Sequence, residues 1–190
     1  TAVIVVSVFL MIALSFMPLG SLNRVCAADQ DRVASQKAFI EASEVLFHPR
    51  CVNCHPSGDA PMIHDNSQSH RFNVRRGAEG KGVGGMSCTL CHRDTNQPDG
   101  PPGVPNWHMP SEHMPMIFHG RTPGDLCRQL KDPKQNGGKT GAQIISHLDS
   151  DPLVLWGWNP GKGRTSPKMD HNTFTAKMRE WVNKGAYCPE

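Results

Sequence analysis

Aromatic side chains are scarce in this chain of 190 residues, where they make up 6% of the positions and include a single tyrosine. All hydrophobic residues together reach 37%, and 18 glycines and 16 prolines interrupt regular structure. Such a chain buries too little apolar surface to offset its conformational entropy unaided. The composition therefore predicts one loop-rich domain whose interior is partly supplied by something other than its own side chains.

Strong charge of either sign is also missing. The formal net charge is +3, and no run of five or more like charges occurs, so nothing in the composition indicates nucleic-acid binding. No glycine-rich phosphate motif opens a predicted helix, and no cluster of acids and bases typical of acid–base catalysis is evident. The charge pattern leaves the chemical class of a partner open.

Charged side chains are absent from residues 1–23, and Ala2 to Met17 is almost wholly apolar. This pattern indicates export or membrane insertion. Val25-Cys26-Ala27-Ala28 offers a small-residue cleavage site, so residues 1–28 are either a signal peptide or a retained N-terminal membrane anchor. Either alternative places the predicted domain, residues 29–190, in the periplasm or on the outer face of the cytoplasmic membrane.

The pentapeptide C-x-x-C-H occurs twice, as Cys51-Val52-Asn53-Cys54-His55 and as Cys88-Thr89-Leu90-Cys91-His92. It is the attachment motif of a c-type haem, in which two thiols add to the vinyl groups and the histidine reaches the iron. Zinc sites usually separate their cysteine pairs by about 15 to 20 residues, whereas residues 55–87 intervene here. Two covalently bound haem c groups are therefore predicted, with His55 and His92 as proximal iron ligands.

Helical periodicity predicts a mainly α fold with extensive irregular loops, in which the haems form much of the core. Helices are expected over 31–47, over 124–131 after Thr122-Pro123, and from about Thr140 to Asp151-Pro152. A last helix should begin at Asp170 or Asn172 and end at Lys184 before Gly185. Residues 56–86 and 98–123 are expected to be loops.

The sequence alone does not identify the second axial ligand of either iron. Residues 107–116 crowd ligand-type side chains together, and His108 and Met114 are the leading candidates there. In the loop between the motifs His70 is preferred over His64 and Met62. His48 is expected at the surface or at a haem edge, and solvent exposure is expected for three further histidines: His119, His147 and His171. Arg71, Arg75 and Arg76 either pair with haem propionates or lie in a solvated loop.

Cysteine usage supports export. The haem motifs account for four of the seven cysteines and Cys26 lies at the possible cleavage site, which leaves Cys127 and Cys188. An oxidising compartment permits a disulfide between them. Two separate buried thiols are the alternative.

From Phe47 to Pro189 the chain resembles small exported cytochromes known as isoquinoline 1-oxidoreductase subunits. The resemblance is carried by Pro105-Asn106-Trp107-His108, Met114-Pro115-Met116, the stretch from Gly120 to Pro133, Gln135-Asn136-Gly137-Gly138, and the stretch from Leu153 to Gly161. It implies an electron-accepting partner for a molybdenum enzyme, and it supports His70 and His108 as ligands.

The sequence thus predicts an electron-transfer dihaem cytochrome, working as a carrier or as a subunit of an exported or membrane redox complex with a protein donor and acceptor. The alternative is a haem enzyme with one open iron site, such as a peroxidase or a small-molecule reductase. Binding of carbon monoxide at one iron would distinguish that alternative.

Overall fold

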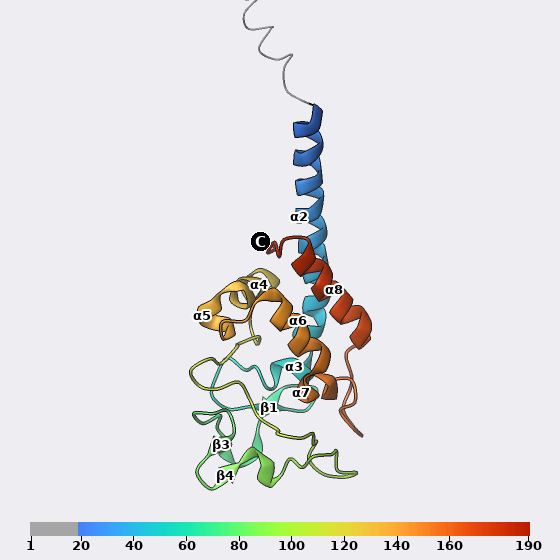
Figure 1. Ribbon diagram of the computed structural model, residues 1–190. Helices are drawn as coiled ribbons and strands as arrows, with labels where there is room; N and C mark the ends of the chain where they lie inside the picture. The colour runs from blue at the N-terminus through green and yellow to red at the C-terminus, as the bar shows by residue number, and fades with distance from the viewer. Residues whose placement is uncertain (1–18) are drawn as a thin grey trace, which may run out of the picture.

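The computed structural model describes the fold of residues 19–190 and the side chains of residues 27–190. The predicted apolar segment, Ala2 to Met17, lies outside the described residues. The fold is mainly α with long loops, as predicted (Figure 1). Within residues 19–190, no helix is long and apolar enough to cross a bilayer.

The longest element is α2 (Leu19–Leu46), which packs antiparallel against α8 (His171–Asn183) (Figure 1). The rings of Phe39 and Trp181 lie 4.9 Å apart, and Ser35 donates a hydrogen bond from Oγ to the Trp181 carbonyl. Helix α2 begins twelve residues earlier than the prediction of a start at Asp31. Its buried face, which includes Ala38 and Ala42, follows the predicted stripe.

A layer of shorter helices lies beside this pair: α4 (Pro123–Lys131), α5 (Pro133–Asn136), α6 (Gly141–Ser150) and α7 (Pro152–Trp156). Thr122 caps α4, and Thr140 forms a capping box with Gln143 at the start of α6. Asp170 caps α8 by accepting a hydrogen bond from the Thr173 amide. The predicted starts of α4, α6 and α8 are confirmed, because each depends on a cap that is local in sequence.

Cys127 and Cys188 form a disulfide, as predicted. It joins α4 to the segment that follows α8, at the end of the molecule where α2 enters (Figure 1). The surrounding core is drawn from α2, α4, α6 and α8 and includes Leu126, Ile144, Phe174 and Met178.

The other end of the molecule is built from loops around short elements (Figure 1). α3 (Pro49–Val52) follows α2 directly, and His48 caps it by accepting from the Arg50 amide through Nδ1 at 3.2 Å. Two small hairpins follow, β1 (Met62–Ile63) with β2 (Gln68–Ser69) and β3 (Gly82–Val83) with β4 (Met86–Ser87), and two turns of 3-10 helix, η2 (Arg71–Asn73) and η3 (Cys88–Leu90). The hairpins replace part of the irregular loop predicted over 56–86. Residues 98–122 contain no helix or strand, as predicted.

Candidate functional site

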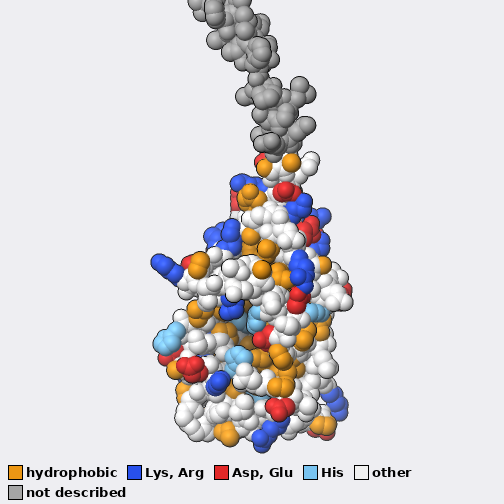
Figure 2. Space-filling model, in the orientation of Figure 1, with side chains coloured by type: hydrophobic (Ala, Val, Ile, Leu, Met, Phe, Trp, Pro, Cys, Tyr) orange, Lys and Arg blue, Asp and Glu red, His pale blue; other side chains and the backbone are white. Residues whose placement is uncertain are grey.

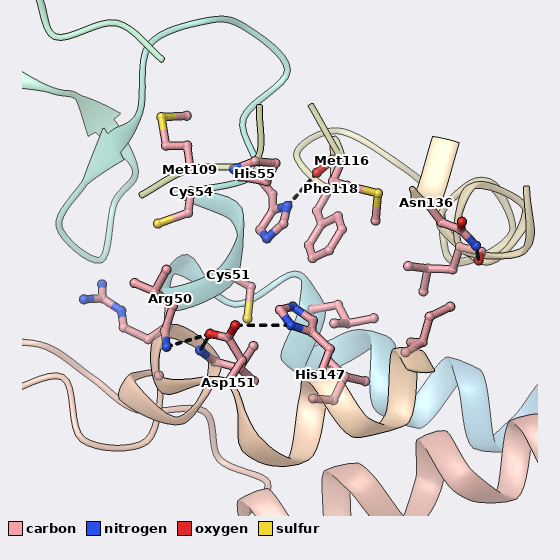
Figure 3. A pocket seen from close by; sticks show the side chains of 18 of the residues that line it. Arg50, Cys51, Cys54, His55, Met109, Met116, Phe118, Asn136, His147 and Asp151 are labelled. Carbon is pink, nitrogen blue, oxygen red and sulfur yellow. Dashed lines mark hydrogen bonds and ion pairs between the residues drawn. The ribbon is translucent and has the colours of Figure 1, made fainter. Parts of the chain in front are cut away.

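The first C-x-x-C-H motif lines a cavity of about 400 Å³ between the helical layer and the loops. α3 carries Cys51, and Cys54 and His55 follow it, so that all three side chains reach the cavity wall (Figure 3). The remaining wall is largely apolar and comes mainly from α2, α4, α5, α6, α7, α8 and the loop before α4. On the face drawn in Figure 2, histidine and hydrophobic side chains gather around a hollow in the middle of the molecule.

Two contacts fix the orientation of the His55 ring. Its Nδ1 lies 2.6 Å from the Met116 carbonyl oxygen, and its ring is stacked on Phe118 with ring centres 3.9 Å apart. Burial is the main reason why the pKa of His55 falls to about 4, so the ring is neutral at pH 7. Nδ1 therefore donates its hydrogen to the carbonyl, and Nε2 keeps a free lone pair directed away from Met116.

His92 is held in the same way at the second motif. Its Nδ1 lies 2.7 Å from the Pro102 carbonyl oxygen, and its ring stacks on Trp107 with centres 4.3 Å apart. Burial again lowers its pKa. Trp107 packs with Cys88 and Trp156 in a second, smaller core. Both motif histidines thus present a neutral ring with Nε2 available for a metal.

One extended segment contacts the histidines of both motifs. Trp107 lies on His92, whereas Met116 and Phe118 lie on His55, so residues 107–118 run from one motif to the other. The Phe118 amide also donates to the His55 carbonyl oxygen at 3.0 Å. We refer to residues 107–118 as the strap.

A buried arginine fixes the strap to the loop between the motifs. Arg76 donates from Nη1 to the carbonyl oxygens of Pro110 and Pro115 and from Nη2 to that of Gly58, and its Nε lies 3.4 Å from an Asp59 carboxylate oxygen. The side chain is therefore neither in a solvated loop nor free on the surface. It joins three loop segments in the interior.

The four motif thiols are free of disulfides. Burial raises the pKa of Cys51 to about 12 and that of Cys54 to about 11, so both are thiols at neutral pH. The Cys88 thiol also contributes to the raised pKa of Cys54. Within the described part of the chain, no group of three or more His, Cys, Asp or Glu side chains is placed to hold a metal ion.

The candidate second ligands fall in two places. His70 lies beside His92, with ring centres 6.2 Å apart and with its Nδ1 2.7 Å from the Arg71 carbonyl oxygen. His108 and Met114 lie on the strap and line the cavity of the first motif. The Nδ1 of His108 is 2.6 Å from the Asn106 carbonyl oxygen, and the Met114 sulfur packs closely on Gly137.

Two cavity residues were not predicted from the sequence. Arg50 is buried against Trp156, its Nη2 is 2.5 Å from an Asp65 carboxylate oxygen, and its Nε is buried without a hydrogen-bond partner. His147 of α6 was expected at the surface and its side chain is indeed 46% exposed, but it also lines the cavity wall across from His55 (Figure 3). The only local sequence features that could have indicated a role for them are the position of Arg50 directly before Cys51 and the position of His147 four residues before Asp151.

The cavity satisfies a simple test for haem. A porphyrin carries a broad apolar ring and two propionates, and the site offers an apolar cavity of suitable size, two thiols, an imidazole with a free Nε2 and a buried guanidinium nitrogen that lacks an acceptor. The donor set fits the group that the motif predicts.

No protein-family model, no curated protein and no solved structure matches this chain.

Proposed function

We propose that this chain is an electron-transfer dihaem c-type cytochrome with one haem c at each C-x-x-C-H motif. The main support for the proposal is that the two motif histidines are held in the same way. Each donates Nδ1–H to a backbone carbonyl oxygen and stacks on an aromatic ring. This arrangement fixes the ring plane and leaves Nε2 for iron, as is usual for histidines that bind a metal.

At the first motif, Cys51 and Cys54 would hold the porphyrin in thioether linkage and His55 would bind the iron. Arg50 is placed to donate its unpartnered Nε to a propionate. The apolar wall, including Leu46, would limit the access of water to the ring. A bound haem supplies a one-electron Fe(III)/Fe(II) couple, whose potential depends on the axial ligands and on burial.

At the second motif, His92 would be the proximal ligand and His70 the second ligand. Two imidazoles that bind one metal from opposite sides, each with a metal–nitrogen bond of about 2 Å, have ring centres about 6 Å apart. His70 and His92 have ring centres 6.2 Å apart, and each directs Nδ1 to a carbonyl oxygen. This pair supports a closed iron site suited to electron transfer rather than to substrate binding.

The partners proposed are a redox protein donor and a redox protein acceptor outside the cytoplasm. The second motif is the more accessible, because Cys91 and Leu90 are exposed at the loop end of the molecule. We therefore assign electron exchange with a partner to the second haem. A molybdenum enzyme complex is the partner class that the family resemblance suggests.

The test is to mature the full chain in a host with a c-type haem attachment system. We expect a mass increase of two haems, a pyridine haemochrome spectrum of thioether-linked haem, and two one-electron steps in a redox titration. A matured chain without covalent haem would overturn the proposal. Rapid binding of carbon monoxide by the reduced wild-type protein would favour the enzyme alternative.

A further inference from the structure

The cavity wall across from His55 carries a histidine that the proposal above leaves without a role. His147 projects from α6, next to the buried Ile144 and Leu148, into the cavity that Cys51 and Cys54 line. Figure 3 shows it on the opposite side of the cavity from His55, with the Cys51 side chain beside it. Since Met116 occupies the Nδ1 side of His55, the Nε2 of His55 faces into the space that His147 borders.

We propose that His147 is the second axial ligand of the first haem and that Asp151 is its positioning residue. This inference rests on the proposed function, because it requires a haem at Cys51 and Cys54. It gives the first iron the same pair of ligand types as the second, an imidazole on each face.

The orientation of His147 supports this role. Its Nδ1 lies 3.3 Å from Oδ2 of Asp151, four residues later, so Nε2 remains free. Asp151 is itself immobilised, because its Oδ1 accepts hydrogen bonds from the amides of Leu153 and Val154 as the N-cap of α7. A carboxylate that accepts from the Nδ1 of a metal-binding histidine fixes the ring and increases the basicity of Nε2.

The rival ligands in the same cavity are less well placed. His108 is oriented only by the Asn106 carbonyl oxygen of its own loop, two residues away. The Met114 sulfur is packed against Gly137, so closely that a Cβ at that glycine would lie 2.9 Å from it. A ligand on a helix, oriented by a second fixed group, holds its geometry better than one on a loop. His147 alone combines a helix with a fixed carboxylate.

The decisive variant is His147→Ala, studied in the matured dihaem protein by magnetic circular dichroism in the near infrared and by carbon monoxide binding. We expect both haems to remain attached, one of the two His/His low-spin signals to be replaced by a high-spin signal, and one carbon monoxide to bind per chain. Added imidazole should restore the low-spin signal. His113→Ala is the matched control, because that side chain is 82% exposed and is expected to leave the spectrum unchanged.

Three further variants keep the inference falsifiable. His147→Met should convert one haem to His/Met coordination with a sulfur-to-iron band, even if the alanine variant matures poorly. Asp151→Asn, which retains a helix cap, should keep both low-spin signals and raise the potential of one haem only. The inference is overturned if His147→Ala retains two His/His signals, or if His108→Ala produces the loss instead. Absence of haem from the wild-type chain would contradict the proposed function, which is a separate outcome.

Discussion

The two C-x-x-C-H motifs share two cysteines and a histidine at the same spacing and the same anchoring of the histidine, yet they lie in different surroundings. The first opens into a cavity walled by residues from all the helices α2 to α8. The second lies among loops, with Cys88 in a small core beside Trp107 and Trp156 and with Cys91 exposed. In the proposed dihaem protein, the motif would therefore determine attachment and one iron ligand, whereas the chain around it would determine burial, the second ligand and access for a partner.

Removing one pair of thiols at a time tests this contrast most strongly. Cys51→Ala with Cys54→Ala should leave one haem and lower the melting temperature of the helical part by about 10 °C or more, because the cavity lies in the main core. Cys88→Ala with Cys91→Ala should also leave one haem but preserve the cooperative melting of the helices. Mass spectrometry and far-ultraviolet circular dichroism give the two readouts. Equal losses of stability would remove the distinction between a core site and a loop site.

Loss of an axial ligand at the second motif should have a smaller and local effect. In His70→Ala we expect the second haem to become high-spin and to bind carbon monoxide, while the first keeps its low-spin spectrum. Unfolding should change little, because His70 lies in a loop and belongs to neither hydrophobic core cluster. His64→Ala is the control in the same loop. An unchanged spectrum in His70→Ala would show that the 6.2 Å approach of the His70 and His92 rings has no role in ligation.

Removal of the disulfide should affect the helical end alone. Cys127→Ala with Cys188→Ala opens a link between residues 61 positions apart, which corresponds to about 3 to 5 kcal/mol of unfolding free energy. Chemical denaturation should record this loss while both haem spectra stay as in the wild type. Perturbation of the second haem would mean that the two ends of the molecule are more tightly coupled than their packing indicates.

The smallest effect is expected from Thr140→Ala. It removes the capping box of α6, the helix that carries His147, and should lower the unfolding free energy by about 1 kcal/mol. Denaturant titration followed at the two haems separately would show an earlier transition at the first site. Thr140→Ser retains the cap and should behave as the wild type.

Helix positions could be predicted because caps and apolar stripes are local signals. Thr122, Thr140 and Asp170 each precede the helix that they cap. The disulfide followed from counting cysteines. The early start of α2 was missed, because the apolar stripe used for the prediction covers only its second half.

The site was only partly accessible to sequence reasoning, because its opposite wall is assembled by tertiary packing. Arg76 is held by carbonyls of Pro110 and Pro115, more than thirty positions away along the chain. His147 lies on a face of α6, and whether that face borders the cavity or solvent depends on how the loops pack against it. The hydrophobic periodicity of the sequence does not show whether such a histidine borders a cavity or solvent. The His147 side chain is in fact 46% exposed.

The anchoring of the two motif histidines has a consequence for assembly. The carbonyl oxygen that orients His92 belongs to a residue only 10 positions away, whereas the one that orients His55 is 61 positions away. Closing the longer loop costs more chain entropy, and the wall of the first cavity also requires α6 and α8. For a chain that emerges N-terminus first, the upstream motif appears earlier but completes its surroundings later. Maturation intermediates should therefore finish their iron coordination in the reverse of the order in which the motifs are synthesised.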